Sequence, residues 1–165
     1  MANLESTMVS NQTGFPRVAN EGHLTARMKR VGPASVEVSA AETAGSILRF
    51  FRIQSDACIS EVLLSCDAIA TGAMDVGLYD TDDNGGAVVD ADLFASAQAV
   101  TAALVASNIA HESGAYTIDN RGKRLWEVLG LSSDPNKAYD VACTVTTGMS
   151  AGTIVLEVTY ADGGQ

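Results

Sequence analysis

The sequence has 165 residues, a length that fits one folded domain with or without an appended segment. Hydrophobic residues make up 47% of the chain and charged residues 18%, a composition that excludes a wholly disordered chain. Acidic residues outnumber basic ones by 20 to 10, and the resulting net charge of −10 disfavours binding to nucleic acid or to an anionic membrane.

The first 34 residues differ in character from the rest. They are rich in Asn, Ser, Thr and Gly and show neither the helical nor the strand period of apolar residues. We therefore expect an extended N-terminal arm at 1–34 and a folded body at 35–165, with a disordered tail as the alternative for the arm. The charge is uneven as well, because residues 1–55 carry +2 and the remainder carries −12.

The body opens with segments that have the pattern of β-strands. Val36 and Val38 alternate with polar residues, and residues 47–53 are β-branched or aromatic on both faces. In 57–66 one face carries Cys58, Val62, Leu64 and Cys66, and in 73–79 one face carries Met74, Val76 and Leu78. Two later segments have helical spacing: 92–106, where a strand followed by a loop is the alternative, and 122–129, with Asn120 as its N-cap and Gly130 just beyond its end. We expect Trp126 to pack that second helix against a sheet.

The C-terminal region carries the clearest pattern. Apolar residues alternate with polar ones at 139–146 and again at 153–160, on either side of a Gly-containing loop. This predicts an antiparallel hairpin with one buried face. The whole pattern favours a mainly β protein, an antiparallel β-sandwich or jelly roll with one or two short helices.

Sequence motifs for catalysis and for cofactor binding lack their required context. Residues 148–152 match the G-x-S-x-G pattern around Ser150, but this motif needs a strand–turn–helix and a later histidine, whereas His23 and His111 both precede it. The three cysteines fit buried, reduced thiols. No stretch approaches the length of a membrane span, and the first 15 residues lack the pattern of a secretory leader. We expect no catalytic residues, no cofactor, no nucleic-acid partner and no membrane partner.

The acidic loop at 80–86 supports two interpretations. Asp80, Asp82 and Asn84 match the first ligands of a calcium-binding loop, but Ala91 stands where the bidentate Glu belongs. The alternative is a hairpin turn in which Asn84 and Gly85 supply the positive φ angles of a type I′ turn. We favour the turn and keep a weak calcium site as the other candidate.

Two stretches of the body resemble small virion structural proteins of tailed bacteriophages. One runs through residues 75–81 and 84–97, and the other through 123–131, 139–142 and 152–156, so that the resemblance extends over roughly 45–161. It lies in scaffold and turn residues. It implies a β-sandwich or jelly roll of the phage head, where proteins of this size act as cement or decoration subunits.

The resemblance further implies a partner and a location. The partner would be the major capsid protein together with other copies of this chain, as a dimer or trimer, and the location would be the capsid exterior after synthesis in the host cytoplasm. A tail or fibre-associated subunit and a ligand-binding β-sandwich are the alternatives. The arm lies outside the resemblance. From its own residues we expect it to bind either the acidic body of a neighbouring copy or the coat lattice, through the following side chains: Phe15, Pro16, Arg17, Arg27, Lys29 and Arg30.

Overall fold

The fold was analysed in a computed structural model, which describes residues 6, 9, 10, 15–19, 28–39 and 41–162. It contains eight strands within these residues: β1 (Met28–Val38), β2 (Ile47–Gln54), β3 (Cys58–Cys66), β4 (Ala73–Asp80), β5 (Val88–Ala99), β6 (Leu104–Asn108), β7 (Ala138–Thr147) and β8 (Gly152–Ala161). The helical elements whose bounds the structure gives between β1 and β8 are single turns: η1 (Asp82–Asn84), η2 (Ile118–Asn120) and α3 (Leu125–Val128). None of the described helices is long and apolar enough to cross a membrane.

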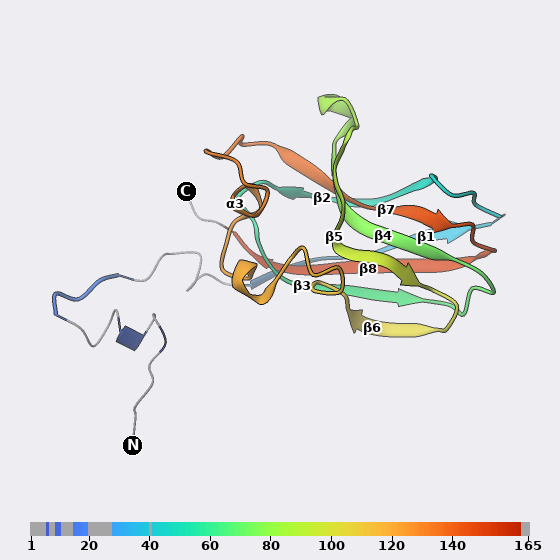
Figure 1. The fold of residues 1–165 in the computed structure, drawn as a ribbon, viewed down its shortest axis with the longest axis horizontal. Coiled ribbons are helices and arrows are strands. Elements are labelled where there is room, and N and C mark those ends of the chain that lie inside the picture. Colours follow the sequence, from blue (N-terminus) through green and yellow to red (C-terminus); the bar gives the residue numbers. More distant parts are fainter. Residues whose placement is uncertain (1–5, 7–8, 11–14, 20–27, 40, 163–165) are drawn as a thin grey trace, which may run out of the picture.

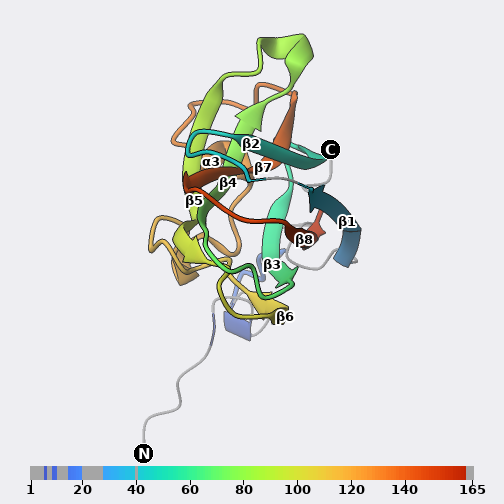
Figure 2. The same ribbon diagram turned by 90° about the vertical axis from the view of Figure 1, so that its right-hand side faces the viewer.

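The strands form two four-stranded antiparallel sheets, in the orders β1-β8-β3-β6 and β2-β7-β4-β5 (Figures 1 and 2). The pairs β1·β8, β2·β7, β3·β6 and β4·β5 are nested one inside the next. The chain therefore behaves as one long double-stranded ribbon, closed by the β4–β5 loop and wrapped so that successive pairs fall in alternate sheets. This is the jelly-roll arrangement, and it confirms the predicted fold class.

The core lies between the two sheets. Inward-facing side chains of β3 and β8 meet those of β4 and β7, and the fully buried members are Val62, Leu64, Met74, Val76, Leu78, Val141, Cys143, Ile154, Leu156 and Val158. All three cysteines are buried thiols that form no disulfide, as expected.

The terminal pair of strands differs from the predicted hairpin. β7 and β8 have the predicted bounds within two residues, but they belong to opposite sheets and do not pair with each other. The loop between them crosses from one sheet to the other, and β8 instead pairs with β1 and β3. The prediction was wrong because alternation shows which face of a strand is apolar but not which strand is its neighbour.

The expected helix at 92–106 is also wrong, and the alternative of a strand followed by a loop fits better. Residues 88–99 form β5, a short loop follows, and 104–108 form β6. The register of β5 against β4 shifts at three points, and Ala97 has a positive φ of 50°. Because each bulge changes which face a residue occupies, the buried residues Leu93, Phe94 and Ala95 are consecutive and the period of two is lost.

The second expected helix is shorter than predicted. Only residues 125–128 are helical, and the N-cap is Arg124 rather than Asn120, which belongs to η2. Gly130 has the expected left-handed conformation, with φ of 70°. The fully buried side chain is Leu125, whereas Trp126 is only partly buried, so Leu125 makes the main contact with the core.

Strand β1 begins earlier than the alternation at Val36 and Val38 suggests. Residues 28–31 already pair with β8, and a bulge at Gly32 and Pro33 precedes the second stretch of pairing at 34–38. The boundary expected between residues 34 and 35 therefore falls inside β1. The bulge, and the largely exposed faces of this edge strand, remove the apolar alternation by which a strand is recognised.

Candidate functional site

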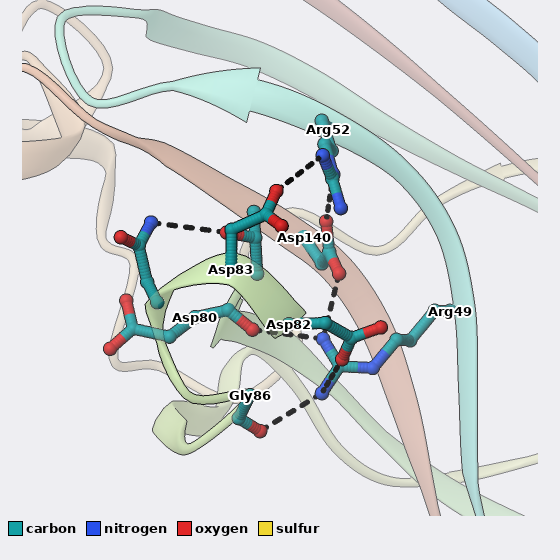
Figure 3. Close-up of polar contacts among 9 residues, drawn as sticks. Arg49, Arg52, Asp80, Asp82, Asp83, Gly86 and Asp140 are labelled. Atoms are coloured by element: carbon teal, nitrogen blue, oxygen red, sulfur yellow. Dashed lines mark hydrogen bonds and ion pairs between the residues drawn. The ribbon is translucent and has the colours of Figure 1, made fainter.

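A cluster of charged side chains lies where β2, β7 and the β4–β5 loop meet (Figure 3). Its centre is Asp140 of β7, whose side chain is only 8% exposed. Arg49 Nη1 lies 2.7 Å from Asp140 Oδ2, and Arg52 Nε lies 3.1 Å from Asp140 Oδ1. One carboxylate thus binds two guanidinium groups, which offsets the cost of burying its charge.

A bulge in β2 brings the two arginines to the same face. In a regular strand, residues three apart point to opposite faces of the sheet. Arg49 is opposite Ala142 and Arg52 is opposite Asp140, so β2 has one more residue than β7 between these positions. The extra residue, Phe50, restores Arg52 to the face that carries Arg49.

Arg49 also holds both ends of the loop between β4 and β5. Its Nη1 donates to the carbonyl of Asp80 and its Nη2 to the carbonyl of Gly86, each at 2.9 Å. Its guanidinium lies 5.7 Å from the ring centre of Tyr79 on β4. Since Arg49 belongs to the edge strand β2, these contacts reach across β7 and fix the base of the loop.

The acidic side chains of the loop are paired individually with different cations. Lys137 Nζ lies 2.5 Å from Asp80 Oδ1, Arg49 lies 4.0 Å from Asp82, and Arg52 lies 3.5 Å from Asp83. The side chains of Asp82 and Asp83 are more than 80% exposed. The loop therefore presents two carboxylates at the tip of a hairpin that projects beyond the sandwich in Figure 1.

The candidate calcium ligands do not converge on one point. Asp80 contacts Lys137, Asp82 faces Arg49, and the amide of Asn84 donates to Thr81 Oγ1 at 3.0 Å. Within the described residues, no group of three or more His, Cys, Asp and Glu side chains has a metal-binding arrangement. The predicted type I′ turn is also wrong, because residues 82–84 form the η1 turn and the positive φ angles belong to Gly85 and Gly86.

Ser150 and His111, the polar residues considered for catalysis, contact groups close to them in the structure. Ser150 Oγ lies 3.2 Å from Thr71 Oγ1, in the loop that crosses between the sheets. His111 Nδ1 lies 2.6 Å from the carbonyl oxygen of Tyr116, and its ring stacks on the ring of Tyr116. His23 lies outside the described residues. Among the described residues, the side chains of Ser150 and His111 each lack the partners that a hydrolase triad requires.

The side chains expected to contact a partner fall into two groups. Lys29 and Arg30 lie in β1 and pair with Asp162 and Glu157 of the same body. Phe15, Pro16 and Arg17 lie ahead of the body and are exposed. Arg27 lies outside the described residues.

Sequence reasoning did not find the cluster around Asp140. The available signal was two arginines three residues apart within the apolar segment 47–53, together with an aspartate on the polar parity of 139–146. Neither position indicates the other, because 88 to 91 residues separate them.

The comparisons with known proteins give matches by structure alone. No protein-family model matches the chain, and no curated protein sequence is significantly similar to it. Among solved structures, a chain in the capsid of Ralstonia phage GP4 aligns with 85% of this chain and 86% of its own length, with a TM-score of 0.55 and 18% identity. A chain of the cyanophage Pam1 capsid asymmetric unit covers 89% of this chain and 94% of its own, with a TM-score of 0.49 and 19% identity. At 18% identity, the likeness to the Ralstonia phage chain shows a common fold.

Proposed function

We propose that this protein is a non-enzymatic cement or decoration subunit of a phage head, bound on the outside of the shell across neighbouring major capsid protein subunits. The observation that carries the proposal is the shared jelly roll, which extends over most of this chain and most of the chain from the Ralstonia phage GP4 capsid. The resemblance of residues 45–161 to tailed-phage virion proteins supports the same conclusion from the sequence.

The charge of the body favours the exterior of the shell. Residues 28–165 carry eight bases and eighteen acids, a net charge of −10. Packaged DNA inside a head is densely anionic and would repel such a surface. An outer position avoids this repulsion and leaves the acidic tip at Asp82 and Asp83 exposed.

The arm is the segment that we propose to reach a neighbouring subunit. Phe15, Pro16 and Arg17 are exposed and belong to a chain segment ahead of β1. A single exposed ion pair contributes about 0–1 kcal/mol. Attachment would therefore depend on many modest contacts, made in parallel by a dimer or trimer and repeated over the lattice.

The proposal is tested with shells of the cognate major capsid protein prepared without this chain. We expect saturable co-sedimentation of the protein with the shells and a higher temperature of shell disruption. Electron cryo-microscopy of native particles should show the jelly roll on the outer surface at junctions between capsid subunits. Density confined to the tail would instead support a tail-associated subunit, and absence of the protein from purified particles would support a ligand-binding module.

A further inference from the structure

A groove with an apolar lining opens where β3 ends and β6 and β8 begin. It has a volume of about 410 Å³, within the range of about 300–1,000 Å³ that is usual for binding pockets. The lining includes Cys66, Asp67, Leu104, Val105, Thr153 and Val155. Val105 is 88% exposed although β6 belongs to a packed sheet, so an apolar side chain of the groove faces solvent in one copy of the chain.

Thr153 of the lining contacts two carboxylates, that of Asp67, which also lines the groove, and that of Glu37 on β1, which lies beside the lining. Asp67 Oδ2 accepts a hydrogen bond from the Thr153 backbone N–H at 3.1 Å, and Glu37 Oε2 accepts one from the Thr153 hydroxyl at 2.5 Å. The residues that line the groove include no Lys or Arg. The groove therefore suits a ligand that has apolar side chains next to a cation.

The described part of the arm combines apolar side chains with a cation. Residues 15–19 read Phe-Pro-Arg-Val-Ala, with one base and no acid. Phe15 is 101% exposed and Val18 is 56% exposed. A fully exposed phenylalanine lacks the stabilisation that burial of its ring would supply, so covering it is favourable. Within one copy of the chain the ring is exposed to solvent, so it is accessible to a second molecule.

We propose that the groove binds the segment 15–18 of a second copy of this chain. Phe15 and Val18 of the incoming arm would lie against Leu104, Val105 and Val155, and Arg17 would face Asp67 and Glu37. Phe15 precedes the start of β1 by 13 residues. An extended chain of that length spans about 45 Å, more than the roughly 30 Å diameter of a small domain, so the arm can reach an adjacent body.

This inference rests on the proposed role of the arm and names its neighbour as another copy of the chain. It does not require the shell, so it is tested with the isolated protein and can fail while shell binding persists. Loss of shell binding with intact arm exchange would in turn contradict only the proposed function.

The test is chemical cross-linking between two chains of different size. One full-length chain carries Phe15→Cys and the other, with a longer tag, carries Val105→Cys; the three native cysteines are buried. Mild oxidation of the mixture should give a disulfide-linked heterodimer. The matched control replaces Val105→Cys by Val88→Cys, since Val88 is a 55% exposed valine of β5, in the other sheet. This control should give no more heterodimer than a partner chain without an added cysteine.

Analytical ultracentrifugation provides a second measurement that needs no cross-link. Phe15→Ala and Val105→Asp should each weaken self-association at least about tenfold, whereas Val88→Asp should leave it unchanged.

Equal cross-linking at Val88 and Val105 would overturn the proposal. So would a cross-link formed only within a chain that carries both Phe15→Cys and Val105→Cys, which would mean that each arm occupies its own groove. A monomeric wild-type chain without any Phe15–Val105 cross-link would overturn it as well.

Discussion

The carboxylate of Asp140 is buried on the central strand β7, and two arginines of the edge strand β2 balance its negative charge. Arg49 and Arg52 are only partly buried, with exposed side-chain fractions of 28% and 54%. They nevertheless bind both oxygens of Asp140, and Arg49 continues to the carbonyls of Asp80 and Gly86. The cluster thereby joins β2, β7 and the loop after β4, three parts of the fold that are distant in sequence.

We therefore expect Asp140→Asn to destabilise the protein strongly. The asparagine keeps the shape of the side chain but removes the buried anion that the two guanidinium groups share, leaving them their exposed anionic partners Asp82 and Asp83. Removing one member of a buried ion pair typically costs about 3–5 kcal/mol, and because Arg52 is half exposed we expect a loss of about 3 kcal/mol. Asp83→Asn is the matched control, because its exposed pair with Arg52 contributes at most about 1 kcal/mol. Urea denaturation measures both, and equal losses would contradict this role for Asp140.

Because several thiol and phenol groups are buried, we expect the protein to lose stability at alkaline pH. Burial raises the pKa of Cys143, Tyr116 and Tyr139, and it raises the pKa of Tyr79 in spite of a hydrogen bond with Thr144. In the unfolded chain Cys ionises at about pH 8.5 and Tyr at about pH 10. Above those values the unfolded chain has released protons that the folded chain retains, so the free energy of unfolding decreases as pH rises.

Urea unfolding at a series of pH values checks this expectation. Stability should change little between pH 7 and 8 as far as these groups are concerned and should fall progressively above about pH 8.5. Cys143→Ala removes one of the contributing groups, and we expect it to make the first part of the decline shallower. A free energy of unfolding that rises between about pH 9 and 10.5 would show that other groups outweigh these.

At the scale of the strand, β8 shows the period of two most clearly. Ile154, Leu156 and Val158 are fully buried between the sheets, and Val155 is only partly buried on the opposite face. β8 is hydrogen-bonded on both sides, to β1 and to β3. Its inward side chains therefore contact the core along the whole strand.

Leu156→Ala should cost about 2–5 kcal/mol, as expected for truncation of a fully buried leucine. Val155→Ala is the matched control on the same strand, and we expect it to cost less than half as much. Chemical denaturation of the two variants measures the difference. A larger loss for Val155→Ala would mean that the strand presents its other face to the core.

The bulge in β1 makes a second prediction about an element. Gly32 has a φ of 101°, and a Cβ at this position would lie 2.7 Å from the carbonyl oxygen of Leu156. Gly45 has a similar φ of 93°, but a Cβ there would have no neighbouring atom within 4 Å. Gly45→Ala should therefore cost only the backbone strain of about 1–2 kcal/mol, and Gly32→Ala should cost more because β1 has to move away from β8. Equal thermal melting temperatures for the two variants would contradict a tight contact at the bulge.

At the scale of the molecule, the ribbon of nested pairs makes the two ends of the body mutually dependent. β1 and β8 are the first and last strands, yet Met28 is opposite Ala161 and Val38 is opposite Gly152. Lys29 and Arg30 add ion pairs to Asp162 and Glu157. Residues 28–34 thus contribute to the body, and only the chain ahead of Met28 is available as an arm.

Two deletions separate the arm from the body. Removing residues 2–27 should leave the far-UV circular dichroism and the urea midpoint close to those of the full chain but weaken binding to shells. Removing residues 2–34 also removes most of β1, leaves the edge of β8 unpaired and should lower the urea midpoint clearly. Full-strength, salt-insensitive shell binding by the shorter deletion would contradict a binding role for the arm.

Several properties follow from the sequence alone, because they depend on local chemistry. The mainly β architecture, the buried face of β8, the burial of the cysteines and the left-handed Gly130 are set by the spacing of apolar residues and by glycine's backbone freedom. Each of these signals lies within a few neighbouring residues, and each was predicted correctly.

Only the tertiary structure decided which strands pair and where charges meet. A period of two identifies an apolar face but no partner, so β7 and β8 looked like a hairpin although they belong to opposite sheets. Bulges in β1 and β5 shift side chains between faces, and they hide the first part of β1 and all of β5 from a search for periodic apolar residues. The contact of Arg49 with Asp140 joins residues 91 positions apart, and it exists because the wrapped ribbon brings the edge strand β2 beside β7.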